Sequence, residues 1–263
     1  MAKNRRPLKG RRPLAREVDF DDVIYGIHAV EETLVAGEAL RSLHVARDRK
    51  KDAPLRILLD RARERNIPVR FEERGFFAKL PFKAHQGVVA MAPPFAYAGL
   101  FDVLRKRRAE PALYVILDHL TDPHNVGAIL RTAECAGADA VILPERRSAG
   151  INATVRKAAA GAAARLPVVR VTNIAETIRR LKEEGVRVVG ADADAALTMG
   201  AAQLDGDLAL VIGAEGGGLA PLVKRECDVL VRIPMRGQLG SLNASVAAGV
   251  LLYEVLRRRE PSP

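Results

Sequence analysis

The chain has 263 residues, of which 48% are hydrophobic, so it can form one large or two ordinary domains with a buried core. Its 42 basic and 32 acidic side chains give a net charge of +10, which favours a polyanionic partner, nucleic acid first, over a protein that is merely basic. Two cysteines and five scattered histidines are too few for a disulfide framework or a metal cluster, so we expect no metal. No apolar run reaches the roughly 20 residues of a membrane span and no signal peptide is visible, so we expect a cytoplasmic protein outside the membrane.

The first predicted element is a basic arm at residues 1–17. Seven of these residues are Lys or Arg, and prolines and glycines lie among them. Because no part of this stretch can form a core, we predict that the arm is disordered. It either holds RNA phosphates by counterion release or serves only as a solubility tail, and its composition does not separate the two alternatives.

Residues 18–93 have the pattern of a small α/β domain. Helical periodicity covers residues 26–34 and 55–65, and short apolar runs predict strands at 43–45, 67–71 and 88–91. No combination of catalytic residue types appears in this part of the chain. Its basic side chains between residues 41 and 51 either contact an RNA backbone or form a solvated edge.

A boundary between two domains is predicted at residues 94–111. Pro93 ends the first domain and Pro94 begins this stretch, and four consecutive basic residues occupy positions 105–108. Prolines and charge runs mark a linker rather than a core, so we expect a second domain at residues 112–263.

Short apolar runs alternate with helical patterns through this second domain. The predicted strands cover residues 112–117, 140–143, 168–171, 186–190, 208–212 and 229–233, and the predicted helices cover 125–136, 153–164, 174–184, 220–227 and 244–259. This alternation is typical of an α/β domain whose mostly parallel sheet is covered by helices on both faces. In such sheets ligands bind beyond the carboxyl ends of the strands, so the loops after the strands are the candidate site.

The first candidate loop follows the first strand and opens a helix. Asp122 can cap this helix with Pro123 at its first position, and Asn125 lies in the first turn. Arg131 projects roughly 140° away from the apolar stripe of the helix. Spacing alone fits a capping amide and a surface arginine, but the position after the domain's first strand favours a ligand site.

Two later loops are the other candidates. Residues 213–218 read G-x-x-G-G-G with Glu215 as the only charge, which matches neither the nucleotide-binding glycine fingerprint nor a P-loop. A loop almost without side chains either lets a ligand approach the backbone closely or is a tight turn with a surface glutamate. Ser241, Asn243 and Ser245 open the last helix, where an N-cap needs only one of them.

Three segments together resemble the ordered motifs of the SpoU family of RNA ribose 2′-O-methyltransferases, within the SPOUT superfamily. The segments are DPHNVGAILRTAECAGADAVIL at 122–143, LVIGAEGGGL at 210–219 and RIPMRGQLGSLNASVA at 232–247. The resemblance implies a C-terminal knotted α/β methyltransferase domain, a homodimer, S-adenosyl-L-methionine as cofactor and an N-terminal RNA-binding domain. Within the family the chain resembles enzymes that methylate a guanosine of 23S ribosomal RNA, so we expect this RNA or a ribosomal precursor as the partner.

The resemblance also implies roles for individual residues. It assigns the cofactor to the backbone at Gly213, Ile233 and Leu242, and it assigns a catalytic surface to Arg131, Asn125, Glu215, Ser241, Asn243 and Ser245. The chain departs from the family pattern at His119, where a small residue is common, and in the loop at residues 236–240. Both departures bear on the choice of substrate.

The implied reaction moves a methyl group from a sulfonium to a ribose 2′-hydroxyl, so the protein must align the oxygen and help to remove its proton. The family pattern makes Arg131 the base. Because an arginine stays protonated in proteins, the alternative role is a clamp on the flanking phosphate that also stabilises the developing alkoxide. Glu215 is the other candidate proton acceptor.

Three other functions stay open on the sequence. A tRNA ribose 2′-O-methyltransferase would share the motifs. A non-catalytic rRNA-binding or ribosome-assembly protein would explain the charge, but not the polar side chains at residues 241–245. A nicotinamide-dependent oxidoreductase is disfavoured because its glycine fingerprint is missing.

Overall fold

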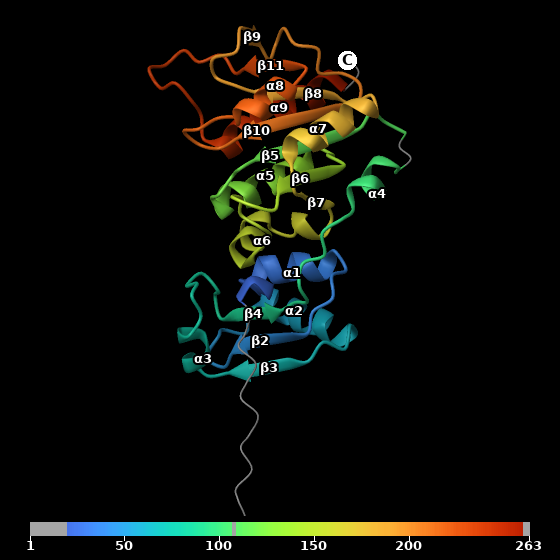
Figure 1. The fold of residues 1–263 in the computed structure, drawn as a ribbon. Coiled ribbons are helices and arrows are strands. Elements are labelled where there is room, and N and C mark those ends of the chain that lie inside the picture. Colours follow the sequence, from blue (N-terminus) through green and yellow to red (C-terminus); the bar gives the residue numbers. More distant parts are fainter. Residues whose placement is uncertain (1–19, 107–108, 260–263) are drawn as a thin grey trace, which may run out of the picture.

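The structure, a computed structural model, describes residues 20–106 and 109–259, so the predicted arm at residues 1–17 lies outside the described part. Figure 1 shows two sheets stacked one above the other, a small N-terminal sheet below and a larger C-terminal sheet above. The chain passes between them through the segment around α4 (Leu100–Leu104). No helix of the described part is long and apolar enough to cross a lipid bilayer.

The N-terminal sheet has four strands in the order β1-β4-β2-β3, in which the β2–β3 pair is parallel and the other two pairs are antiparallel. The elements are β1 (Val23–Tyr25), α1 (Ile27–Val35), β2 (Ser42–Ala46), α2 (Ala53–Glu64), β3 (Val69–Glu72), α3 (Arg74–Ala78) and β4 (Val88–Met91). Leu55 and Leu58 of α2 are buried together with α1 on one face, as the predicted apolar stripe requires. Phe77 of α3, a helix that was not predicted, packs on the other face.

The C-terminal sheet has seven strands in the order β7-β6-β5-β10-β8-β11-β9, and every strand pairing recorded within it is parallel. The strands are β5 (Leu113–Asp118), β6 (Ala140–Pro144), β7 (Val168–Val171), β8 (Arg187–Ala191), β9 (Leu197–Thr198), β10 (Leu208–Gly213) and β11 (Val229–Arg232). One face is covered by α5 (Pro123–Cys135), α6 (Ala153–Ala159) and α9 (Ala244–Arg259), and the other by α7 (Ile174–Glu183) and α8 (Pro221–Glu226). The predicted α/β class, with a mostly parallel sheet covered on both faces, is therefore confirmed.

The sequence of β5 explains why this strand lies buried in the middle of the sheet. Val115 and Leu117 lie in the core cluster under α5, whereas Tyr114 and Ile116 lie in the cluster under α7. All four side chains are at most 1% exposed. Burial on both faces requires apolar residues at every position, so the run ends only at Asp118, where the strand reaches the candidate site.

The helix predicted over residues 153–164 is wrong in its second half. It stops at Ala159, because Ala160 and Gly161 adopt left-handed φ angles of 47° and 89°, and a 3₁₀ turn follows. Gly161 lies directly against Glu32 of α1, where an added Cβ would be 2.5 Å from the Glu32 Cβ. Contact with the N-terminal domain therefore overrides the helix propensity of an alanine-rich run.

The segment predicted as a linker, residues 94–111, carries structure of its own. Ala98 forms a parallel bridge with Val169 of β7, and α4 buries Val103 in the core cluster beneath α7. This segment therefore extends the edge of the larger sheet before the chain enters β5.

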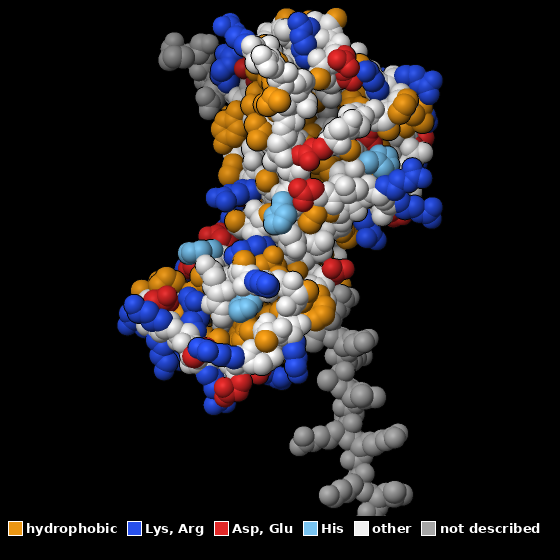
Figure 2. All heavy atoms as spheres, turned by 90° about the vertical axis from the view of Figure 1, so that its left-hand side faces the viewer, with side chains coloured by type: hydrophobic (Ala, Val, Ile, Leu, Met, Phe, Trp, Pro, Cys, Tyr) orange, Lys and Arg blue, Asp and Glu red, His pale blue; other side chains and the backbone are white. Residues whose placement is uncertain are grey.

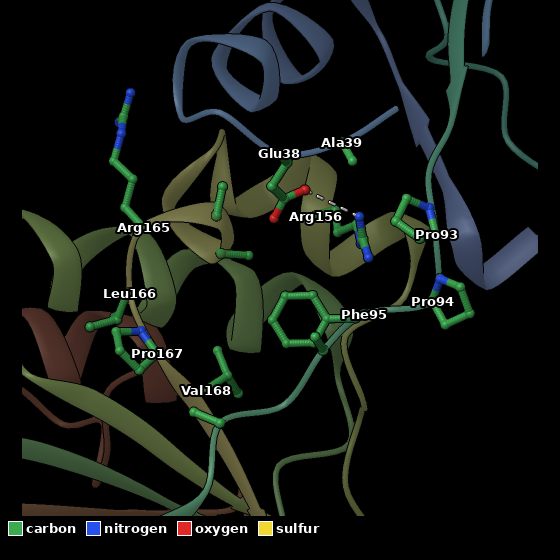
Figure 3. Close-up of a pocket in the computed structure, with 14 residues that line it drawn as sticks. Glu38, Ala39, Pro93, Pro94, Phe95, Arg156, Arg165, Leu166, Pro167 and Val168 are labelled. Atoms are coloured by element: carbon green, nitrogen blue, oxygen red, sulfur yellow. Dashed lines mark hydrogen bonds and ion pairs between the residues drawn. The ribbon is translucent and has the colours of Figure 1, made fainter. Parts of the chain in front are cut away.

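The two domains meet through α6, as Figure 3 shows. Arg156 of α6 is only 6% exposed, and its Nη1 lies 3.5 Å from Glu38 Oε2 while its guanidinium lies 5.3 Å from the centre of the Phe95 ring. A cavity of about 340 Å³ adjoins this pair. Burial raises the pKa of Glu38 and lowers the pKa of Arg156, so desolvation outweighs their attraction. A second pair, Arg165 Nη2 to Glu32 Oε2 at 2.9 Å, lies at the exposed edge of the joint.

On its other side α6 packs against α5, the helix that carries Asn125 and Arg131. A Cβ added at Gly127 of α5 would lie 2.4 Å from the Ala158 Cβ and 2.7 Å from the Val155 carbonyl oxygen. Only glycine permits this approach of the two helices. The helix α6 is therefore held between the candidate site and the N-terminal domain.

Candidate active site

Three loops converge at the carboxyl edge of the C-terminal sheet. They follow β5, β10 and β11, and the register places Gly213, the last residue of β10, opposite Asp118, the last residue of β5. Because all of these strands are parallel, their carboxyl ends open on the same edge. The three loops predicted as candidates are therefore brought to one place.

One carboxylate oxygen in the loop after β10 accepts hydrogen bonds from two side-chain amides, one on α5 and one just before α9. Glu215 Oε1 accepts hydrogen bonds from Asn125 Nδ2 at 2.8 Å and from Asn243 Nδ2 at 2.5 Å. Asn243 Nδ2 also donates to Asn125 Oδ1 at 3.0 Å, which closes the triangle. Each of the three predicted site residues thereby holds the other two. We call this group the Asn125–Glu215–Asn243 triangle.

Asn243 is also the N-cap of α9. Its Oδ1 accepts from the Ser245 backbone N–H at 2.9 Å, from Ser245 Oγ at 2.6 Å and from the Val246 N–H at 3.3 Å. The predicted cap before the last helix is confirmed, and Asn243 provides it. The same amide therefore stabilises the helix with its oxygen and holds the triangle with its nitrogen.

The glycine loop after β10 is a tight turn. Ala214 and Gly218 exchange two backbone hydrogen bonds of 3.0 and 2.9 Å, and Gly216 and Gly218 have φ angles of 74° and 62°. A Cβ added at Gly213 would lie 2.3 Å from the carbonyl carbon of Gly218, so the turn closes on this glycine. The turn holds Glu215 above the ends of β5 and β10, and its remaining residues expose bare backbone.

Asp118 is a structural support of the site that the sequence patterns do not predict. Its side chain is 1% exposed; Oδ2 accepts the Ala220 N–H at 2.6 Å, and Oδ1 lies 2.5 Å from His119 Nδ1. Asp118 thus ties the loop after β10 to the end of β5. His119 has a left-handed φ of 60°, a conformation that favours glycine, so this departure from the family pattern is stabilised by its own neighbour. A carboxylate that ends an apolar strand was the available signal.

Arg131 lies on the exposed side of α5, while Val126, Leu130 and Ala133 of the predicted stripe are buried. Within residues 20–106 and 109–259 it makes no hydrogen bond or ion pair. Its neighbour Thr132 faces α9, where a Cβ added at Gly249 would lie 3.7 Å from Thr132 Cγ2. The structure thus leaves the Arg131 guanidinium free for an anion, but outside the triangle.

The other predicted residues lie around the same edge. Ser241 is exposed and hydrogen-bonds to no residue that the structure describes, whereas Ser245 is joined to the triangle through Asn243. The proposed cofactor residues Gly213, Ile233 and Leu242 are all partly buried. Gly213 ends β10, Ile233 follows β11 and Leu242 lies shortly before α9. The apolar side chains of Ile233 and Leu242 and the backbone of Gly213 suit an organic molecule and supply no side-chain ligand for a metal ion. In the described part of the chain no three His, Cys, Asp or Glu side chains are grouped as metal ligands.

Comparison with known proteins gives consistent matches over both domains. Residues 112–253 match the model of the SpoU rRNA Methylase family, and residues 23–98 match the model named RNA 2′-O ribose methyltransferase substrate binding. The chain is 42% identical over 244 residues to YacO of Bacillus subtilis, named for the TrmH family of tRNA/rRNA methyltransferases, with 91% of this chain and 97% of YacO covered. A Staphylococcus haemolyticus relative with the same family name is 43% identical over 241 residues, covering 91% of this chain and 96% of its own.

Solved structures also match, over 60–90% of the chain. The SpoU methyltransferase AviRb of Streptomyces viridochromogenes in complex with AdoMet has a TM-score of 0.74 and 26% identity, with 90% of each chain covered. A structure described as an RNA 2′-O ribose methyltransferase has the same TM-score and 27% identity, with 90% of this chain and 88% of that chain covered. A TrmH/SpoU tRNA-modifying enzyme of A. aeolicus, at 29% identity and a TM-score of 0.52, covers 60% of this chain.

Proposed function

Because the chain belongs to the SpoU rRNA methylase family, we propose that it methylates the 2′-hydroxyl of a guanosine ribose in 23S ribosomal RNA, the specificity of RlmB enzymes. The chain is an RNA 2′-O-ribose methyltransferase that uses S-adenosyl-L-methionine; the guanosine and the ribosomal substrate are the proposed part. One observation carries the assignment of the site. The Asn125–Glu215–Asn243 triangle places a carboxylate at the sheet edge where the family's three motifs converge.

The residues at the carboxyl edge fit the cofactor. Exposed backbone around Gly213 and the apolar side chains of Ile233 and Leu242 can hold a nucleoside and an aliphatic chain without a charged partner. When bound, S-adenosyl-L-methionine supplies a methyl group that the sulfonium charge has already activated. The protein's own task is therefore to orient the ribose oxygen and to accept its proton.

Glu215 is suited to the second of these tasks. Its Oε1 is occupied by the two asparagine amides, whereas its Oε2 accepts no hydrogen bond from any described residue. The amides fix the orientation of the carboxylate, so Oε2 can accept a hydrogen bond from the 2′-hydroxyl and then its proton. Arg131 stays protonated, and its planar guanidinium can donate two parallel hydrogen bonds to the phosphate beside the target ribose.

We also propose that the enzyme works as a homodimer. Leu239, Val246 and Tyr253 are 78%, 51% and 52% exposed, and they lie in the loop before α9 and on α9 itself, beside the triangle. An apolar surface at this place favours burial against a second copy of the chain. Such an interface would close the site and place the partner's surface against the RNA.

The knotted topology and the location also remain proposals. Parallel β10 lies between β5 and β8, while β11 lies beyond β8 and α9 returns across the sheet to pack on α5. This path is compatible with a chain threaded through its own loops after β10. The substrate, free 23S ribosomal RNA or a ribosomal precursor, would be met in the cytoplasm.

The decisive experiment measures methyl transfer from radiolabelled S-adenosyl-L-methionine to 23S ribosomal RNA, to 16S ribosomal RNA and to tRNA, followed by mapping of 2′-O-methylated positions. Cells with and without the gene provide the matched comparison. A single guanosine of 23S RNA that loses its methyl group supports the proposal. Methylation of tRNA alone would replace the substrate, and no methyl transfer to any RNA would favour the non-catalytic alternative.

A further inference from the structure

A second pocket lies in the N-terminal domain, between the end of β2, α3 and the loop that leads into β4. Its volume is about 600 Å³. We call it the basic pocket, and its lining includes Arg49, Lys50, Arg74, Lys83, Phe77 and Phe82. Its elements lie on the left in Figure 1, and that side faces the viewer in Figure 2, where blue basic side chains surround apolar and histidine surface.

The basic pocket carries an excess of positive charge. Four Lys and Arg side chains line it, against the single carboxylate of Asp48, which pairs with Arg74 Nε at 2.5 Å. The side chains of Lys50 and Lys83 are exposed, and their ammonium groups have no hydrogen bond or ion pair with any residue in the described ranges. Two ammonium groups are therefore available to bind an anion at the rim.

Arg49 holds the inner edge of the basic pocket. Its side chain is 15% exposed, and its Nη1 donates to the Gln86 carbonyl at 2.5 Å while Nη2 lies 3.5 Å from Asp52 Oδ2. Its buried Nε–H has no partner among the described residues. Arg49 therefore joins the turn at Gln86 to Asp52 and keeps its charge beside the pocket.

The turn whose carbonyl oxygen accepts a hydrogen bond from Arg49 has a strained backbone conformation. Gln86 and Gly87 have left-handed φ angles of 53° and 70°, and the Gly87 N–H donates to His85 Nδ1 at 3.0 Å. Non-glycine residues in this conformation persist only where their surroundings fix them, and they concentrate at binding sites. The turn leaves the side chain of Gln86 exposed, with an amide that can pair with the edge of a base.

Aromatic rings form the wall of the basic pocket. Phe82 is fixed by a stacked contact with Tyr25, with ring centres 4.1 Å apart and planes 7° apart. Phe77 packs against His85 with ring centres 4.9 Å apart. Burial lowers the pKa of His85, which favours its neutral ring. Phe77 is buried and supports the wall, so the partly exposed Phe82 is the rigid, uncharged ring that the wall offers beneath a rim of cations.

We propose that the basic pocket binds one unpaired nucleotide of the substrate RNA, with its base on the aromatic wall and its flanking phosphates on Lys50 and Lys83. The inference rests on the proposed function, which makes RNA the polyanion. Proteins recognise single-stranded RNA by this combination of aromatic stacking and phosphate contacts. An acidic peptide would need the cations of the basic pocket but not its aromatic rings. The volume of the basic pocket is in the range of sites that bind small ligands.

The test measures binding of the full chain to a fluorescein-labelled single-stranded oligouridine by anisotropy at several salt concentrations. The double variant Lys50→Ala/Lys83→Ala should lose about tenfold in affinity, and its salt slope should fall by about 1.4, because each phosphate contact on a single strand contributes about 0.7. The control Arg56→Ala/Arg65→Ala removes two exposed charges, one from α2 and one from the residue that caps its end, on the other face of the sheet. It should lose much less affinity and keep most of the slope.

Phe82→Leu tests the aromatic wall, because it removes the ring and keeps an apolar side chain. Its affinity for the oligouridine should fall about tenfold, while its affinity for a blunt RNA duplex should not change, since paired bases cannot reach the rings. The proposal is overturned if the lysine pair behaves like its control, or if Phe82→Leu binds oligouridine as the wild type does. Failure of the proposed function looks different: these binding effects would appear, yet no RNA would be methylated.

Discussion

Asn125 and Glu215 are 90 residues apart in the chain, yet their side chains are joined by a hydrogen bond of 2.8 Å. The contact exists because β5 and β10 are neighbours in register, so that the loops after them face each other. Asn243 completes the triangle from a third loop. Groups that act as a unit have effects on catalysis that do not add.

Glu215→Gln should abolish most methyl transfer without loss of the fold. The glutamine oxygen can still accept from Asn125 and Asn243, but an amide cannot take up the proton of the 2′-hydroxyl. The rate of single-turnover methylation should fall at least about a hundredfold, with cofactor affinity nearly unchanged. Glu184→Gln, an exposed change at the end of α7, is the matched control and should keep the wild-type rate. A wild-type rate for Glu215→Gln would remove this carboxylate from the mechanism.

Arg131→Ala should leave stability within about 0.5 kcal/mol, because its side chain is exposed and has no partner among the described residues. Methyl transfer should nevertheless fall by roughly a hundredfold or more, as expected when a contact to transition-state charge is lost. Arg225→Ala, an exposed arginine on α8, is the control.

Arg131→Lys separates the two roles of Arg131. A phosphate clamp needs the planar fork, so lysine should restore little activity at any pH. A base would behave differently, since lysine has the lower pKa and activity should return as the pH rises. Single-turnover rates measured across pH decide between the two, and a pH-dependent recovery would contradict the clamp.

Asn243 offers a way to separate stability from chemistry. Asn243→Ser keeps a capping oxygen for α9 but loses the amide that reaches Glu215, so unfolding should change little while methyl transfer falls strongly. Asn243→Ala should in addition lose about 1 kcal/mol of unfolding free energy. The control is Asn173→Ala, which removes the comparable cap of α7 and should cost stability alone. Equal activity of Asn243→Ser and the wild type would reduce Asn243 to a cap.

Glu254 predicts a pH dependence of stability. Hydrogen bonds from Arg257 and Arg258 lower the pKa of its carboxyl from an ordinary 4.5 to about 2. A folded-state pKa below the unfolded one stabilises the protein fully above 4.5, and this contribution disappears as the pH falls through about 2. Glu254→Gln should therefore unfold at lower denaturant concentration than the wild type at neutral pH. The gap should close in acid; a gap that widens in acid would contradict the assignment.

The parts of the fold that follow from the sequence are those with a long or strict pattern. Strand β5 is readable because burial on both faces makes it continuously apolar, and α2 is readable from its stripe. The five residues of α3 and the two of β9 are too short to show a period. The end of α6 depends on Gly161 meeting Glu32, a contact between domains that no local pattern contains.

The residues of the site also differ in how far the sequence predicts them. Asn243 was readable as a cap and Arg131 as an exposed side chain, but each also fits an ordinary surface role. Only the parallel register of β5 and β10 brings Glu215 to Asn125. The one signal for Asp118 was a carboxylate at the end of an apolar strand, and it does not reveal the role of this residue, which depends on the Ala220 N–H far along the chain.

The position of α6 between α5 and the N-terminal domain has a geometric consequence. Gly127 brings α5 against α6 without an intervening side chain, and α6 in turn carries the buried Arg156 and packs on β1 and α1. The span from the triangle to the basic pocket is therefore set by packed backbone rather than by a flexible tether. An RNA held at both ends must present its target ribose at one fixed distance from the captured nucleotide. The enzyme would then reject an RNA whose local sequence is suitable but whose three-dimensional structure holds the ribose and the captured nucleotide at a different distance.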